Sequence, residues 1–279
     1  MPKIALFVGG ELDWFTTDFD YFVGVDRACL YLLELGLPLD LAVGDFDSVS
    51  ELELDIIQST AKSCKKASAE KNDTDTELAL KLIFQAYPEA EVTIFGAFGG
   101  RIDHMLSNVF LVSDPQLAPF MDRICLRDKQ NKITYCSEGK HEFLPEPDMT
   151  YISFLQEGDG ELTILGAKYE LTSSNYFQKK IYSSNEFVDG PIHVTVPNGL
   201  SSRLEIGVSM IYLLTLLTFL SLGFLVVLYL KNVELKEQLN KSLEENADNL
   251  SDQISFQLEN FAKTNQLETT KQLNQLQVA

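Results

Sequence analysis

The chain changes character near residue 203, and this break constrains its fold more than any other feature. Before it, short apolar runs alternate with Gly, Asp, Asn and Pro. After it, residues 206–230 form a run of 25 residues without a charged side chain. A helix of that length can cross a hydrocarbon layer of about 30 Å, and buried helices of soluble proteins rarely stay uncharged for so long. We therefore expect a globular part before residue 203 and a transmembrane helix over 206–230.

The segment after the apolar run predicts a long helix. Residues 231–279 are polar, rich in Gln, Asn, Glu and Leu, and contain no Gly or Pro. Apolar residues recur there at spacings that place them on one stripe of a helix, namely Leu235, Leu239, Leu250, Ile254, Leu258 and Phe261. Such a stripe is typical of a coiled-coil-like helix, although its imperfect heptads do not identify the partner.

Residues 1–125 alternate between predicted strands and helices. The apolar runs Ile4–Val8, Tyr21–Val25 and Val92–Phe95 predict buried strands. Amphipathic patterns predict helices over 27–35, 50–60, 74–87 and 103–113, the third with Thr74 or Asp73 as its N-cap. This alternation predicts an α/β catalytic domain, with a mostly parallel sheet and helices on both faces.

Residues 126–203 predict a second, all-β domain. Short strand-like runs are separated by Gly, Pro and Asn, namely Ile133–Tyr135, Tyr151–Leu155, Glu161–Leu165 and His193–Val196. Runs of this kind favour a small antiparallel sandwich or barrel. The predicted order is thus the α/β domain, the β-sandwich domain, the membrane helix and the long helix of 231–279.

Net charge limits the possible partners. Acidic residues outnumber basic ones by 41 to 22, a formal charge of −19. A surface this negative repels phosphate backbones, so we expect no nucleic-acid partner. The four cysteines are scattered without a CxxC pair, which is typical of reduced thiols in a cytoplasmic protein.

Three acidic motifs follow predicted strands or open predicted helices. They are Gly44-Asp45-Phe46-Asp47-Ser48, Asn72-Asp73-Thr74-Asp75 and Gly99-Gly100-Arg101-Ile102-Asp103-His104. Loops of this kind gather beyond the carboxyl ends of strands in an open α/β sheet. Carboxylates converging there would repel one another unless a cation neutralised them, and hard oxygen ligands suit Mg²⁺. Each motif taken alone is equally typical of a turn or a helix cap.

The glycine-rich turn adds a phosphate-binding hypothesis. Arg101 supplies a planar set of donors, and Gly99 and Gly100 allow backbone N–H groups to approach a phosphate. The chain contains no GxxxxGK[ST] loop, which excludes a P-loop enzyme. His104 is either a structural residue or a general acid or base.

Five segments in this order resemble bacterial thiamine pyrophosphokinases over residues 1–200: GVDRACLYLLELGLPLDLAVGDFDSV, EKNDTDTELAL, GAFGGRIDHMLSN, GAKYEL and SSNEF. The resemblance implies transfer of a pyrophosphoryl group from ATP to the hydroxyl of thiamine, giving thiamine diphosphate and AMP. It also implies homodimers, paired through the catalytic and sandwich domains, with thiamine bound between the subunits.

The resemblance also implies roles for individual residues. It assigns the Mg²⁺ site to Asp45, Asp47, Asp75 and Asp103. It adds Asp73 as a further candidate, and it assigns thiamine binding to Ser184 and Asn185, with Ser183 assisting. From the residues themselves we expect Ser48, Gly99, Gly100 and Arg101 to bind ATP, and Arg101 also to act in catalysis by neutralising charge on the phosphates. We expect Asp103, with Asp75 as the alternative, to accept the hydroxyl proton, and Tyr169 to lie in the sandwich core. One departure is Asn72, where the family commonly has an acidic residue.

The tail departs from the family. The resemblance ends near residues 196–199, so we expect the last sandwich strand to be missing or replaced. The tail resembles the start of membrane-anchored coiled-coil proteins of the RmuC type. Two alternatives follow: a membrane-anchored enzyme whose catalytic part is cytoplasmic, or two joined coding units, the second starting at Met210. Lys231, Lys236 and Lys241 favour placing the tail on the cytoplasmic side, which opposes the anchored arrangement.

Two other functions compete with the enzyme. The globular part could be a membrane-anchored scaffold or sensor that binds nucleotide or thiamine without turnover. It could also be a metal-dependent transferase acting on another alcohol. AMP release that depends on thiamine distinguishes the three.

Overall fold

The computed structural model describes most of the chain before residue 207 and parts of the tail. The described residues are 1–67, 72–147, 149–158, 160–197, 227–243, 246, 249–251, 253–260, 262 and 263, with the backbone of 201–206. The chain divides into two units, Met1–Met210 and Ile211–Ala279. Each is described by itself.

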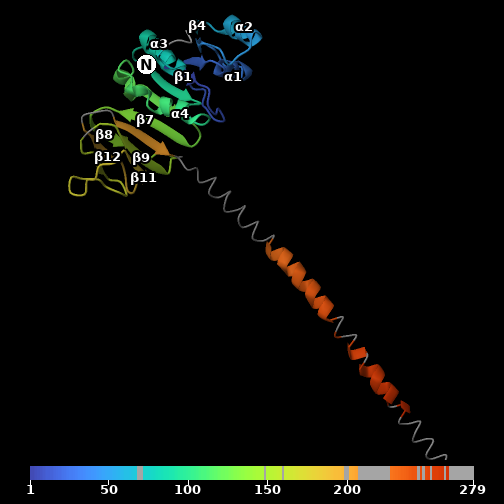
Figure 1. The fold of residues 1–279 in the computed structure, drawn as a ribbon. Coiled ribbons are helices and arrows are strands. Elements are labelled where there is room, and N and C mark those ends of the chain that lie inside the picture. The colour runs from blue at the N-terminus through green and yellow to red at the C-terminus, as the bar shows by residue number, and fades with distance from the viewer. Residues whose placement is uncertain are drawn as a thin grey trace, which may run out of the picture. The chain divides into compact units, whose positions relative to one another are not determined.

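The first unit is built on a sheet of ten strands (Figure 1). Its first half consists of parallel strands β1 (Lys3–Phe7), β2 (Tyr21–Val25), β3 (Leu41–Gly44), β4 (Cys64–Lys66), β5 (Glu91–Phe95) and β6 (Ile124–Arg127). Its second half is antiparallel and consists of β7 (Asn131–Cys136), β9 (Tyr151–Gln156), β11 (Ile181–Asn185) and β13 (Ser201–Ile206). The spatial order is β11-β9-β13-β7-β6-β5-β1-β2-β3-β4.

Helices cover both faces of the parallel half. They are α1 (Ala28–Glu34), α2 (Glu51–Thr60), α3 (Asp75–Ala86) and α4 (Ile102–Val109), followed by the short 3₁₀ helices η1 (Leu111–Ser113) and η2 (Ala118–Arg123). One core cluster joins Leu6 and Ile94 to Leu80 of α3, and the other joins Phe7 and Phe95 to Leu32 of α1. Because both faces are covered, β1 is buried over Ile4–Phe7 without alternation.

A second, three-stranded sheet completes a sandwich with the antiparallel half. It pairs β10 (Thr163–Leu165), β12 (Ile192–Val196) and β8 (Gly139–Phe143) in that order. Strand β12 alternates between buried and exposed residues, as expected for a sheet with one face in the core. Phe143 and Val194 of this sheet pack with Phe154 of the larger one. The predicted α/β fold and the β-sandwich are therefore both present.

Two sequence predictions are corrected. The last strand of the sandwich is not missing: β13 lies between β7 and β9 and pairs with both. The helix predicted over 103–113 ends at Val109, and η1 follows it. The domain boundary predicted at residue 125 remains a prediction, and the ten-stranded sheet crosses it through the β6–β7 pairing.

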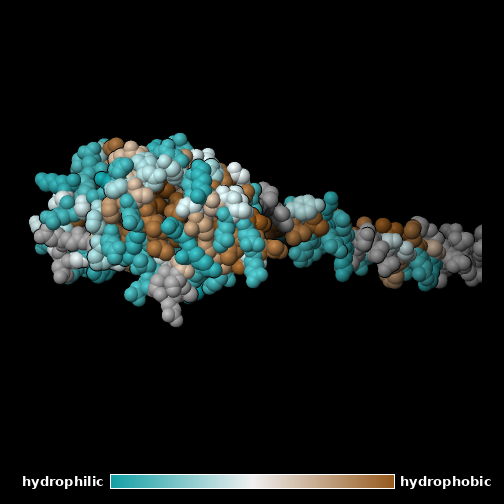
Figure 2. Space-filling model, turned by 90° about the horizontal axis from the view of Figure 1, so that it is seen from above, coloured by the Kyte–Doolittle hydropathy of each residue, from teal (hydrophilic) through white to brown (hydrophobic). Residues whose placement is uncertain are grey.

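The second unit contains helix in its described parts. Residues 227–243 and 253–260 are helical, and the apolar stripe is exposed there, with Leu235, Leu239 and Leu258 each about 60% exposed. Apolar and hydrophilic residues are both visible on this helix in Figure 2. Residues 207–226, most of the predicted membrane span, lie outside the described residues. Among the helices that the structure describes, none has the length and apolar character needed to cross a membrane.

Candidate functional site

A cleft of about 570 Å³ lies at the carboxyl ends of the parallel strands. Its walls come from the turns after β1, β2, β3 and β5 and from the first turns of α3 and α4. The chain leaves β1 toward β2 on one side, and β5 lies on the other side of β1. The cleft is thus at the point where strand order reverses, the usual ligand site of such sheets.

The floor of the cleft is backbone. The Gly10 N–H donates to the Gly96 carbonyl oxygen at 2.9 Å, joining the turns that follow β1 and β5. A Cβ atom at Gly10 would lie 2.3 Å from that oxygen, so a larger residue would force the two turns apart. Both glycines line the cleft. A ligand can therefore approach the main chain closely at this point.

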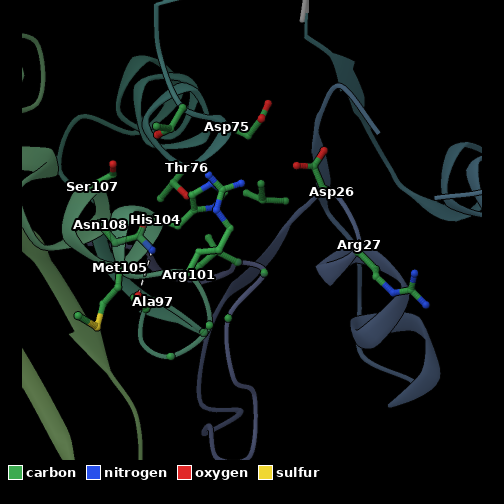
Figure 3. Close-up of a pocket in the computed structure, with 18 of the residues that line it drawn as sticks. Asp26, Arg27, Asp75, Thr76, Ala97, Arg101, His104, Met105, Ser107 and Asn108 are labelled. Carbon is green, nitrogen blue, oxygen red and sulfur yellow. Dashed lines mark hydrogen bonds between the residues drawn. The ribbon is translucent and has the colours of Figure 1, made fainter. Parts of the chain in front are cut away.

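Three carboxylates converge at one side of the cleft. One oxygen each of Asp26, Asp45 and Asp75 lies within 4.8 Å of the other two. Asp26 follows β2, Asp45 follows β3, and Asp75 opens α3. In Figure 3, Asp26 and Asp75 face one another from different elements. These three residues, here called the acidic cluster, are each partly buried.

Asp75 is placed by the cap of its helix. The Thr74 hydroxyl accepts a hydrogen bond from the Glu77 N–H at 3.2 Å, and the Glu77 carboxylate accepts one from the Thr74 N–H at 2.7 Å. This reciprocal capping box starts α3 at Asp75, as the sequence predicted. A cation bound to Asp75 would be disfavoured by the helix dipole, so the carboxylates must supply the attraction.

Asp26 is held in a conformation that a non-glycine residue rarely adopts. Its φ is +48°, its N–H donates to the Val43 carbonyl at 2.9 Å, and its Oδ1 accepts from the Phe46 N–H at 3.1 Å. Phe46 is also left-handed, at φ +60°, although it is bulky and buried. A Cβ atom at Gly44 would lie 1.8 Å from Asp26 Oδ1, so this carboxylate fits only beside a glycine. Two strained residues in contact indicate a functional constraint.

The electrostatics of the cluster oppose its ionisation. Burial raises the pKa of Asp26 from 3.8 to about 6, against the hydrogen bond from Phe46, and the negative charges of Asp75, Asp45 and Asp47 add to the rise. Asp26 was not among the site residues predicted from the sequence. Its position directly after the predicted strand Tyr21–Val25 is the signal that could have identified it.

The other residues predicted from the first two acidic motifs do not join the cluster. Asp47 and Ser48 line the cleft but are exposed, and the Asp47 N–H donates to Asp45 Oδ1 at 3.1 Å. Asp73 instead forms an ion pair with Lys81 of α3 at 2.9 Å, and Lys81 also contacts Asp114 at 2.6 Å. Although burial disfavours its charge, hydrogen bonds to Asp114 and Asp73 raise the pKa of Lys81.

Asp103 also lies outside the acidic cluster. Its carboxylate accepts hydrogen bonds from Arg101, from Nε at 3.2 Å and from Nη2 at 2.6 Å, and both side chains are mostly exposed. The hydrogen bond from Arg101 lowers the pKa of Asp103 below its usual value. Arg101, Gly99 and Gly100 line the cleft, as does His104, and Figure 3 shows Arg101 reaching into it.

The predicted thiamine residues lie on β11 and do not line the cleft. Ser183 and Ser184 are exposed, and Ser184 is left-handed, at φ +62°, with its N–H donating to the Ser153 hydroxyl at 3.2 Å. Asn185 is buried, and its side chain binds both backbone groups of Tyr169. The expectation that Tyr169 lies in the core is wrong, because this residue is 60% exposed.

Comparisons with known proteins agree on one family. The chain matches the description "Thiamin pyrophosphokinase, catalytic domain" over residues 13–119 and "Thiamin pyrophosphokinase, vitamin B1 binding domain" over residues 140–201. A curated thiamine pyrophosphokinase from Bacillus subtilis is 34% identical over 181 residues, which cover 62% of this chain and 83% of that protein.

Solved structures show the same likeness. A thiamin pyrophosphokinase family protein from Enterococcus faecalis is 40% identical with a TM-score of 0.69, and the match covers 74% of this chain and 99% of that one. The thiamine pyrophosphokinase of Bacillus subtilis is 30% identical with a TM-score of 0.62, over the same shares of the two chains.

Proposed function

The chain belongs to the thiamine pyrophosphokinase family, and we propose that its cleft binds ATP, with Mg²⁺ held by the acidic cluster. The enzyme transfers a pyrophosphoryl group from ATP to the hydroxyl of thiamine and releases AMP. The observation that carries the proposal for the site is the convergence of Asp26, Asp45 and Asp75 at the carboxyl edge of the sheet.

The residues of the cluster fit a magnesium ion. Three carboxylate oxygens from three elements lie close enough to share one cation, and Mg²⁺ prefers such ligands while keeping several waters. Burial and the negative charges of neighbouring carboxylates raise the pKa of Asp26, and a cation would offset both effects. Mg²⁺ bound there would neutralise charge on the phosphate oxygens of ATP.

The opposite wall of the cleft supplies donors for the phosphates. Arg101 reaches into the cleft while it is paired with Asp103, and Gly99 and Gly100 precede it. A phosphate that replaces Asp103 as the partner of Arg101 would gain a bidentate contact. Asp103 would then lose the hydrogen bonds that lower its pKa, and it becomes a better acceptor for the thiamine hydroxyl proton.

A second copy of the chain completes the thiamine site in this proposal. Ser183 and Ser184, which the family resemblance assigns to thiamine, do not line the cleft of their own chain. A homodimer would bring β11 of one subunit to the cleft of the other. The left-handed Ser184 supports a binding role because strained residues concentrate at ligand sites. Asn185 would act by fixing the backbone of Tyr169 rather than by direct contact.

For the tail, we propose an anchor over 206–230 and coiled-coil pairing over 231–279, with the catalytic part in the cytoplasm, where ATP is available. Lys231, Lys236 and Lys241 favour the opposite orientation, so this proposal has the charge bias against it. The exposed stripe Leu235, Leu239 and Leu258 supports the pairing. The alternative is that a second coding unit begins at Met210. Detection of a single polypeptide of 31.3 kDa in cell membranes would support the anchored enzyme, and a shorter species in the soluble fraction would support the joined units.

The decisive assay measures AMP release from ATP by the purified full-length chain, with and without thiamine. The enzyme releases AMP only when thiamine and Mg²⁺ are both present. Binding of thiamine or ATP without AMP release would instead identify a sensor, and release with another alcohol but not thiamine would identify a different transferase.

A further inference from the structure

A second recess lies on the face of the ten-stranded sheet that points away from α3. It has a volume of about 480 Å³ and shares no lining residue with the catalytic cleft. Its floor is formed by β5, β6 and β7, where Thr93 pairs with Cys125 and Cys125 pairs with Thr134. Neighbouring residues along a strand point to opposite faces, and Leu126 packs in the core on the α3 side. The recess therefore opens away from α3.

The wall of this recess, here called the Trp14 groove, comes from the segment between β1 and β2. Trp14, Thr16 and Phe19 of that segment line it. Trp14 is anchored by an edge-to-face contact with Phe95, at 6.2 Å between ring centroids. Trp14 is also the single tryptophan of the chain.

Arg127 is the unusual residue of the groove. Its guanidinium lies over the Trp14 ring, with Cζ 5.3 Å from the centroid. Its Nη1 lies 3.8 Å from Glu146 Oε2, which is beyond hydrogen-bond distance, while the other oxygen of that carboxylate accepts from Lys132. Stacking on Trp14 thus fixes the plane of the guanidinium without satisfying its donors.

The Nε of Arg127 is a buried donor without an acceptor. It is shielded from solvent, and no residue that the structure describes accepts a hydrogen bond from it. Leaving a buried donor unsatisfied costs free energy, and more so for a charged group. A charged side chain kept at this cost in the wall of a groove indicates a binding role for Arg127.

We propose that the Trp14 groove is a second, non-catalytic binding site for a small molecule that carries a carboxylate or a phosphate. Two oxygens of such a group match the paired Nη donors at the end of a guanidinium, and the Arg127 side chain is 30% exposed although its Nε is not. The hydroxyls of Thr16, Thr93 and Thr134 line the same groove and can donate to the remaining oxygens. Trp14 and Phe19 offer an apolar surface to the rest of the ligand.

The fluorescence of Trp14 tests this proposal because no other tryptophan contributes to the signal. The full-length chain is titrated with inorganic phosphate, inorganic pyrophosphate and acetate, each against KCl of equal ionic strength. We expect a saturable change in Trp14 emission with a phosphate probe, with acetate, or with both. The probe that saturates shows whether the site takes phosphates or carboxylates.

Two substitutions test whether the change in Trp14 fluorescence depends on Arg127. Arg127→Met keeps the apolar stem on Trp14 and removes every donor, so we expect binding about tenfold weaker or worse. The matched control is Arg123→Lys, because Arg123 lines the same groove but donates to the Pro88 carbonyl. Thiamine-dependent AMP release by both variants shows that each is folded.

A third variant tests whether the fluorescence signal arises from binding in the catalytic cleft or in the groove. Asp75→Asn alters the acidic cluster and leaves the groove intact, so the fluorescence titration should be unchanged. A saturable signal that survives in Arg127→Met but is lost in Asp75→Asn would overturn the proposal by assigning the anion to the cleft. Responses to all three probes that equal the response to KCl would also overturn it.

Discussion

Both sides of the cleft have carboxylates beside them, but the two sides hold these carboxylates differently. On one wall, Asp26, Asp45 and Asp75 come from three elements, are partly buried and lie within 4.8 Å of one another. On the other wall, Asp103 is exposed and already paired with Arg101, two residues away. A cation would offset the repulsion within the acidic cluster, whereas Asp103 is already paired with Arg101.

The fold holds the acidic cluster in one conformation, whereas Arg101 and Asp103 would have to separate before either could contact a ligand. The left-handed Asp26 and Phe46 and the close approach of Gly44 hold the cluster in place before any ligand arrives. The Arg101–Asp103 pair lies at the exposed start of α4, and in the proposed function it would have to separate before Arg101 could bind phosphate. Substitutions on the two walls should therefore differ in their effects on activity and on stability.

The largest effect is expected on catalysis at the cluster. Asp75→Asn removes one of three charges that would hold Mg²⁺ and keeps the size of the side chain. We expect kcat for thiamine-dependent AMP release to fall on the order of 10²- to 10³-fold. Glu77→Gln, in the same helix turn but outside the cluster, is the control and should stay within a few-fold of the unaltered enzyme. Equal losses in the two variants would contradict a special role for the cluster.

The second-largest effect is on stability, and here we expect a gain and not a loss. Asp26→Asn keeps an acceptor for the Phe46 N–H and removes a charge that the fold disfavours. The shift in the Asp26 pKa from 3.8 to about 6 corresponds to at most about 3 kcal/mol when the group is fully ionised, and solvent screening of this partly buried group reduces that value. We therefore expect Asp26→Asn to be more stable to urea than the unaltered chain at pH 7.5 without Mg²⁺, and much less active.

The pH dependence sharpens this prediction. Because the folded pKa of Asp26 is raised, its contribution to stability is complete below about pH 4 and is lost as the pH rises through about 6. The stability advantage of Asp26→Asn should therefore grow between pH 4 and pH 7 and then level off. Urea denaturation at each pH measures it, and an advantage that shrinks as the pH rises would contradict the assignment.

A smaller effect is expected on the other wall. Arg101→Met removes the phosphate donors from an exposed site, so kcat/KM for ATP should fall about 10- to 100-fold while stability changes little. Arg101→Lys keeps the charge without the bidentate geometry and should recover part of the loss. A loss of stability as large as the change expected for Asp26→Asn would contradict the description of Arg101 as exposed and replaceable.

The smallest effect concerns the residue that keeps Asp73 outside the cluster. Lys81 joins Asp73 to Asp114 in a half-buried network, so Lys81→Met leaves two carboxylates without their shared partner. We expect a loss of about 1–2 kcal/mol in unfolding free energy and a modest rise in the Mg²⁺ concentration needed for half-maximal activity. The double variant Lys81→Met/Asp73→Asn should regain part of that stability, and no recovery would contradict the pairing.

The sequence predicted those parts of the fold whose signal is local. Continuous apolar runs identified β1, β2 and β5, and the Thr74–Glu77 spacing identified the start of α3. Polar strands such as β4 and β8 were not predicted, because Cys-Lys-Lys and Gly-Lys-His-Glu-Phe gain their strand conformation from pairing with a neighbouring strand. Strand β13 was expected to be lost because sequence similarity to the family fades just before it.

The site was predictable to a similar extent. Asp45 and Asp75 follow from acidic turns after strands, and both are in the cluster. Asp26 also directly follows a predicted strand, but it was missed because its carboxylate is brought to the cluster by a left-handed turn beside Gly44, which only the folded chain shows. Asp73 and Asp103 fit the same pattern but lie beside Lys81 and Arg101, so their placement depends on pairing that only the folded chain shows.

The most direct test of the acidic cluster locates the cation itself. Crystals grown with Mn²⁺ in place of Mg²⁺ and with an ATP analogue would give an anomalous difference map in which the metal is unambiguous. The account predicts a peak within about 2.5 Å of oxygens of Asp26, Asp45 and Asp75. A peak on Asp103 or Asp73 with none at those three carboxylates would contradict it.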